Sequence, residues 1–249
     1  MRICSIVVGT RVAVGAMTGW LLAAGSLQAL LASAAPSVAY AHGVTAGDKG
    51  YIMETLGTRI VPFMYLGAKH MVTGYDHLLF LFGVIFYLYR LKDIGVYVTL
   101  FAIGHSMTLI AGVLTGVHVN AFVIDAVIGA SVIYKALDNL GVFSRWLRYQ
   151  PNPRTATMVF GLCHGLGLAT KMLDFALGRD GLLGNLLAFN VGVEVGQFLS
   201  LCVILIAMSF WRRSASFVRY AAAANVLLLM SGVALVIYQV NGYFTASPT

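Results

Sequence analysis

The chain has 249 residues, of which 59% are hydrophobic and only 10% are charged, and its mean hydropathy is +0.86. A soluble domain carries about a quarter charged residues, so the composition excludes a soluble globular protein, a disordered chain and a disulfide-stabilised scaffold. The formal net charge of +7 comes from basic residues in short groups between apolar segments, not from one patch that would bind nucleic acid. The composition therefore predicts an all-α, polytopic membrane protein.

Residues 1–41 have the features of a secretory signal peptide. Two arginines lie near the N-terminus, residues 12–31 are mostly apolar, and residues 39–41 (Ala-Tyr-Ala) form a small-x-small cleavage site. Cleavage there makes His42 the mature N-terminus, where an amine and an imidazole can bind one metal ion together. The alternatives are an uncleaved first transmembrane helix and a histidine that merely follows the cleavage site.

Six further segments are apolar over about the 20 residues needed to cross a bilayer. The loops after the first, third and fifth of them carry most of the lysine and arginine. Because cytoplasmic loops are enriched in these residues, both ends of the mature chain are expected on the periplasmic side of a bacterial inner membrane. Residues 42–249 thus form a single membrane domain, a six-transmembrane-helix bundle after a cleaved signal peptide. The expected spans are 63–89, 94–116, 119–141, 155–177, 183–210 and 217–240.

These spans contain ionisable side chains, which are costly inside a membrane and usually face a cavity or a partner. When depth is counted at 1.5 Å per residue, four of them fall near mid-membrane, one in each of four spans, and two more lie nearer the outer face. Convergence at one depth predicts an ion site with an entrance. The mid-membrane residues are His77, His105, His164 and Glu194, and the outer ones are His70 and Asp125.

The spacing of the polar residues agrees with one shared site. His70, Gly74 and His77 follow an i, i+4, i+7 pattern and would share a stripe of one helix, with Asp76 next to His77. Glycines flank several of the polar residues and would let helix backbones approach closely. Singly, each polar residue is explained by an interhelical hydrogen bond or by packing; together they favour a functional centre. The fifth span repeats the same spacing with Asn190, Glu194 and Gln197.

Four segments resemble motifs of the HupE/UreJ family of membrane proteins, which is associated with nickel supply to hydrogenase and urease. Residues 70–77 (HMVTGYDH) are similar to the family's signature, in which the aspartate and both histidines are associated with nickel transport. Residues 101–109 (FAIGHSMTL), 160–167 (FGLCHGLG) and 189–197 (FNVGVEVGQ) resemble three further motifs, in the same order. The resemblance covers about residues 63–242 and implies a nickel permease-like protein.

The leading hypothesis is a permease for a divalent transition-metal ion, nickel first and cobalt second. The ion would be the transported substrate and not a bound cofactor, and no enzymatic activity is expected. Imidazole and carboxylate ligands suit a borderline divalent ion. The expected partners are the lipid bilayer and the metal ion, with a homo-oligomer or an accessory subunit also compatible. The proposed ligands are His70, Asp76, His77, His105, His164 and Glu194, with His42, Asp125, Asn190 and Gln197 as further candidates.

Two other functions are compatible with the same residues. An intramembrane metal-dependent hydrolase could hold zinc and activate a water with three histidines, an aspartate and Ser106, although the chain contains no H-E-x-x-H pattern. A haem-binding electron-transfer subunit could use histidines from separate helices as axial ligands, although acidic residues so close to the histidines are not expected around haem.

Overall fold

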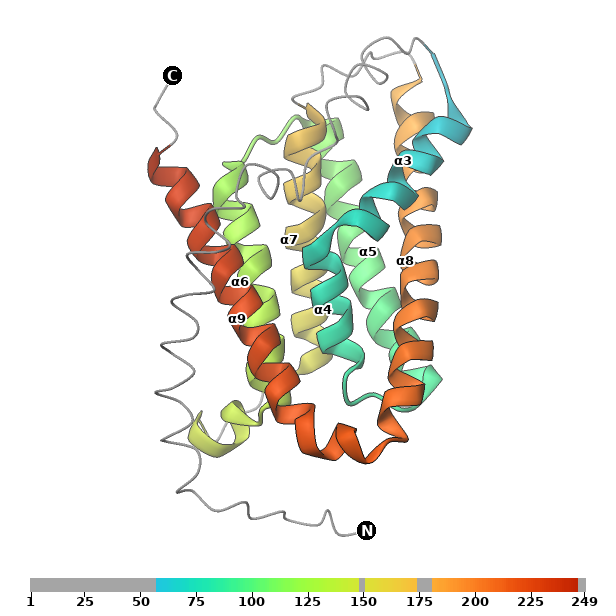
Figure 1. Ribbon diagram of the computed structural model, residues 1–249. Coiled ribbons are helices and arrows are strands. Elements are labelled where there is room, and N and C mark those ends of the chain that lie inside the picture. The colour runs from blue at the N-terminus through green and yellow to red at the C-terminus, as the bar shows by residue number, and fades with distance from the viewer. Residues whose placement is uncertain (1–56, 148–150, 174–180, 246–249) are drawn as a thin grey trace. The chain divides into compact units, whose positions relative to one another are not determined.

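The computed structural model describes residues 57–147, 151–173 and 181–245, and the regular elements among them are helices (Figure 1). The all-α prediction is therefore confirmed for this part of the chain. The expected signal peptide, residues 1–41, and His42 lie outside the described residues. The elements in chain order are α3 (Ile60–Thr73), α4 (Tyr75–Ile85), α5 (Leu91–Thr115), α6 (Ala121–Asn139), the π-helix η2 (Phe143–Leu147), α7 (Pro153–Leu173), α8 (Leu182–Arg212) and α9 (Ala215–Thr245).

Four of the described helices, α5, α7, α8 and α9, are long and apolar enough to cross a membrane, and α4 is apolar but shorter. The chain is thus a multi-pass membrane protein, as predicted. Helix α6 is 19 residues long but carries the charged side chains of Asp125, Lys135 and Asp138. The expected number of six spans stays a prediction.

The expected first span, 63–89, is not one continuous helix. The chain becomes extended at Gly74, with φ −73° and ψ 100°, so α3 ends and α4 begins there. The Gly74 amide still donates to the carbonyl oxygen of His70 at 2.9 Å. The break places Asp76 and His77 in the first turn of α4, where the positive end of the helix dipole favours a carboxylate. Substrate sites in transporters are commonly built at such interrupted helices.

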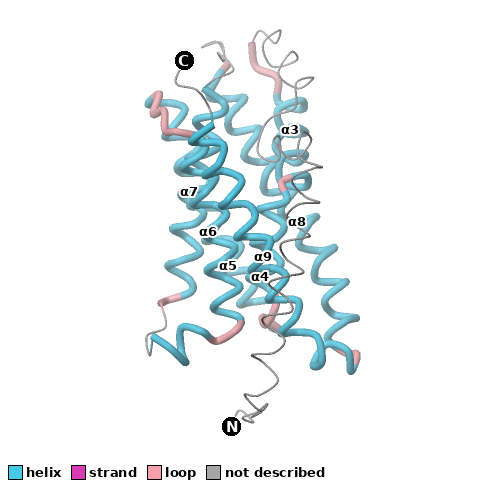
Figure 2. Tube along the Cα trace, turned by 60° about the vertical axis from the view of Figure 1, so that its left-hand side comes forward, coloured by secondary structure: helices cyan, strands magenta, loops and turns pink. Residues whose placement is uncertain are grey.

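The helices pack mainly in pairs, α5 against α7, α3 against α8 and α6 against α9, and loops join them at the two ends of the bundle (Figure 2). Glycines make two of these pairs close. A side chain at Gly192 would overlap the backbone of Met64 on α3, and one at Gly165 would overlap the carbonyl oxygen of His105 on α5. The close helix approach predicted from the small residues is confirmed at both contacts.

The bundle has one end rich in basic side chains, where α4 joins α5 and α8 joins α9 (lower in Figure 1). We call it the basic end; the start of α3 and the end of α9 lie at the opposite end. Arg212 donates to the carbonyl oxygens of Ile85 and Phe86 and so caps the end of α4. Its guanidinium also lies 4.6 Å from the centre of the Tyr89 ring. Other basic residues in or next to these connections are Arg90, Lys92, Arg213 and Arg219.

Candidate metal centre

Ionisable side chains from α3, α4, α5 and α7 meet inside the bundle. Asp76, His77, His105 and His164 are each at most 2% exposed, and His70 is half-buried. Buried ionisable groups are costly and occur where they have a partner or a ligand. Each of these residues was a predicted site residue, and the structure brings all five together.

The five residues form two sets of three that share His77. The first set is His70, His77 and His105, and the second is Asp76, His77 and His164. In each set, one ligand atom from every residue lies within 4.8 Å of the others. Ligands that are each about 2.1 Å from one ion lie within roughly 4.2 Å of one another. A small approach of the side chains would therefore close either set around a metal ion.

His77 occupies the centre of the group. Its ring centroid lies 4.8 Å from that of His164, 5.1 Å from that of His70 and 6.0 Å from that of His105. The break at Gly74 does not separate His70 from His77, because Gly74 is the only residue between α3 and α4. The arrangement offers two adjacent groups of side chains that could each hold a metal ion, with His77 common to both.

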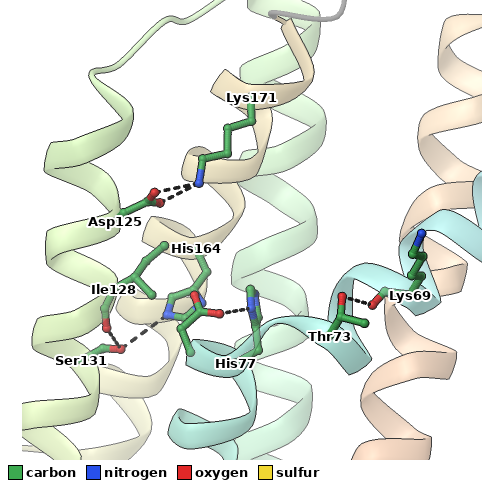
Figure 3. A network of polar contacts seen from close by, with 9 residues as sticks. Lys69, Thr73, His77, Asp125, Ile128, Ser131, His164 and Lys171 are labelled. Atoms are coloured by element: carbon green, nitrogen blue, oxygen red, sulfur yellow. Dashed lines mark hydrogen bonds and ion pairs between the residues drawn. The ribbon is translucent and has the colours of Figure 1, made fainter. Parts of the chain in front are cut away.

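Asp76 contacts the His77 ring directly, with 3.1 Å between its Oδ1 and Nδ1 of His77 (Figure 3). A carboxylate next to a ligating imidazole fixes the orientation of the ring and raises its basicity. A Cβ atom at Gly74 would lie 2.8 Å from His77 Nδ1 and 3.2 Å from Asp76 Oδ1. The contact therefore depends on glycine at the break.

Ser131 on α6 contacts His164 on α7, with 3.4 Å between Oγ and Nε2 (Figure 3). The Ser131 hydroxyl donates to the carbonyl oxygen of Ile128 at 2.6 Å, so its oxygen accepts from His164. In this arrangement a neutral His164 ring would carry its proton on Nε2, and its Nδ1 atom would be the one that can bind an ion. Ser131 was not among the residues predicted from the sequence. The signal that could have indicated it is a single serine among apolar residues in an expected span.

His105 is fully buried, and neither of its ring nitrogens has a hydrogen-bond partner among the described residues. Its ring lies along that of Phe101, with 6.1 Å between centroids. A buried polar group without a partner costs about 1–3 kcal/mol, which a bound ion would offset. This is the feature of the site that points most directly to a ligand.

A family model described as HupE / UreJ protein matches residues 46–247. The match includes every described helix. The chain belongs to the HupE/UreJ family. Members of this family are transporters rather than enzymes and are associated with nickel and cobalt uptake, which confirms the predicted family and the expected lack of enzymatic activity. Comparisons with curated proteins and with solved structures found no significant match.

Two other predicted ligands of this HupE/UreJ protein lie outside both sets. Glu194 is on the exposed side of α8, because the opposite side of that helix packs on α3. Asp125 accepts from the Lys171 ammonium at 3.0 and 2.8 Å, in an ion pair between α6 and α7 (Figure 3). The structure thus places Glu194 away from the histidines and gives Asp125 a cationic partner.

The two amides predicted on α8 are both buried in this HupE/UreJ protein and are not part of either set. Asn190 donates to the carbonyl oxygen of Leu186 at 2.9 Å within its own helix. Gln197 donates to the carbonyl oxygen of Val98 on α5 at 3.3 Å. Gln197 therefore links α8 to α5, and it lines the same small cavity as His77.

Proposed function

We propose that the protein is a permease that carries Ni²⁺, and Co²⁺ second, across a bacterial inner membrane. The two ligand sets that share His77 carry this proposal. Each set offers only three side chains, so the ion keeps part of its water shell and is not held in a closed cage. Such binding is strong enough for entry and weak enough for release.

The ligand types support nickel or cobalt as the substrate. Both sets are built from imidazole, and the second adds one carboxylate, which suits a borderline divalent ion. Cys163 lies next to His164 in the chain, but it is half-buried and belongs to neither set. A thiolate site for Cu⁺ is therefore a poorer match for the same residues.

The proposed topology is a bundle of six spans after a cleaved signal peptide, with the basic end in the cytoplasm because such loops are retained there. His42, at the mature N-terminus, and His70 then collect the ion at the periplasmic side. The membrane potential favours inward movement of a divalent cation by about 4.6 kcal/mol per 100 mV. The chain contains no G-x-x-x-x-G-K-[ST] motif for nucleotide binding, so the gradient, this potential or another subunit would drive the flux.

Resident haem is a poorer match for the same histidines. Phe101 lies 5.0 Å and Phe80 5.8 Å from the His164 ring, measured between centroids. The cavity next to His77 has a volume of only about 10 Å³. A porphyrin between these rings would require the helices to move apart, whereas a single ion requires only a small side-chain shift.

Uptake of radioactive nickel at trace concentration tests the proposal, in cells that lack other nickel importers. His77→Ala removes the ligand common to both sets, so uptake should fall to the background of cells without the protein. His118→Ala is the matched control, because His118 is exposed and belongs to neither set. Unchanged uptake by His77→Ala at equal membrane levels would contradict the proposal. Competition by cobalt, zinc and copper would rank the ions.

A further inference from the structure

A small, mainly apolar cavity adjoins His77 on the side that faces the basic end. Its walls include Phe80, Phe101, Leu81 and Val84, and its volume is about 10 Å³. That volume holds about one water molecule and is too small for a hydrated ion. Phe80 and Phe101 lie 5.4 Å apart between ring centroids. The cavity is thus a narrow, mainly apolar constriction directly next to the metal centre.

Gln197 supplies an oxygen at the margin of this constriction. The side chain is 1% exposed and lines the cavity. Its amide group donates to Val98, but its Oε1 atom has no hydrogen-bond partner among the described residues. A buried acceptor without a donor is costly, and an amide oxygen is also a ligand for cations. Gln197 therefore offers a neutral, weak ligand beside His77.

Tyr97 connects the constriction to a second cavity, since it lines both. The second cavity is open, has a volume of about 500 Å³ and is lined by Tyr97 and residues 151–154. The two cavities therefore lie in series between the metal centre and the basic end.

The distance from the histidines to each cavity can be counted along helix α7, which runs from the open cavity to His164. Thr157 lines the constriction and precedes His164 by seven residues, which is about 10 Å along a helix axis. Arg154, at the open cavity, precedes it by ten residues, or about 15 Å. The Thr157 hydroxyl donates to the carbonyl oxygen of Pro153 at 2.8 Å, so its oxygen can still accept. Polar atoms thus continue from the histidines toward the basic end.

We propose that the metal ion leaves the histidine group through this series of cavities. The inference rests on the permease function proposed above. Gln197 Oε1 is the first ligand after His77, and Tyr97 is the last side chain before the open cavity. Phe80 and Phe101 form the constriction that must part for the ion to pass. A neutral amide oxygen suits this step because it binds a cation more weakly than a carboxylate does and so permits release.

Separate measurement of transport and binding tests the route. Gln197→Leu removes the oxygen, together with the NH2 group that donates to Val98, and puts an apolar side chain of similar size in their place. Initial nickel uptake should fall about tenfold or more, while the purified protein should bind nickel with a Kd within about threefold of the unmodified value. Gln239→Leu on α9 is the matched control, because Gln239 is half-buried and lines neither cavity. Its uptake and Kd should both be unchanged.

Unchanged uptake by Gln197→Leu would overturn the route, and so would a Kd weakened in parallel with uptake, since Gln197 would then belong to the histidine group. A His77→Ala variant that still transports would instead refute the permease function itself. If Gln197→Leu does not reach the membrane, Tyr97→Phe takes its place, because it removes only one hydroxyl. It should lower uptake several-fold at an unchanged Kd, and full uptake by this variant would overturn the route.

Discussion

Oδ1 of Asp76 lies 3.1 Å from Nδ1 of His77, its neighbour in the chain, in the first turn of α4. In the middle of a continuous helix, adjacent side chains point about 100° apart. Both residues lie within α4, and their side chains meet in the space that a Cβ atom at Gly74 would fill. The pair therefore exists at the point where the first expected span is interrupted.

Asp76→Asn is expected to weaken nickel binding about 10- to 100-fold, because it removes both the negative charge of the second set and the carboxylate that orients His77. Isothermal titration of the purified protein with nickel measures the effect, and uptake should fall in parallel. Asp76→Glu keeps the charge and should retain more of both. Equal Kd values for Asp76→Asn and the unmodified protein would show that the carboxylate takes no part in binding.

Much of the centre was predictable because hydropathy gives the depth of a residue in the membrane. His77, His105 and His164 lie at similar distances from their span ends in the sequence, and the structure brings their rings together. The glycines beside the polar residues also predicted close approach of helix backbones, which the structure shows where Gly165 meets His105. Depth and small-residue spacing depend on local sequence, so one chain was sufficient to obtain them.

The face on which a residue lies was not predictable, because it depends on which helices become neighbours. Glu194 was expected at the depth of the histidines, but α8 turns its glycine side toward α3 and leaves Glu194 exposed. The interruption at Gly74 was also missed, since residues 63–89 are apolar enough for one continuous span. Both differences arise from packing between distant segments.

Glu194→Gln is expected to leave nickel binding by the purified protein within about threefold of the unmodified Kd, because Glu194 belongs to neither ligand set. The same titration that detects loss of binding in Asp76→Asn provides the comparison. Loss of binding of similar size in Glu194→Gln would mean that α8 turns its other side to the histidines in the active protein.

Gly165→Ala should separate α5 from α7, because the added Cβ would overlap the carbonyl oxygen of His105. Such overpacking costs about 1–3 kcal/mol and displaces His105 from His77, so thermal stability in detergent and nickel binding should both fall. Gly95→Ala is the control on α5, where a Cβ would meet no atom within 4 Å. Gly95→Ala should bind nickel as the unmodified protein does, and its free energy of unfolding should rise by up to about 1 kcal/mol, because alanine is the better helix former. Equal effects of the two substitutions would contradict the close contact.

The Asp125–Lys171 pair lies between α6 and α7, with side chains only 8% and 14% exposed. Lys171→Met leaves the carboxylate buried without its cation, which should lower stability by about 3 kcal/mol. The double variant Asp125→Asn/Lys171→Met removes both charges and should recover most of that loss.

Nickel uptake by the same variants shows whether the Asp125–Lys171 pair only stabilises the fold or whether Asp125 also receives the ion. Because Lys171 already neutralises Asp125, we expect the double variant to recover uptake together with stability. Membrane levels, a thermal melt and initial uptake rates would be measured for both single variants and the double variant. A double variant that is stable but still does not transport would show instead that the Asp125 carboxylate receives the ion on its way to His70 and His77.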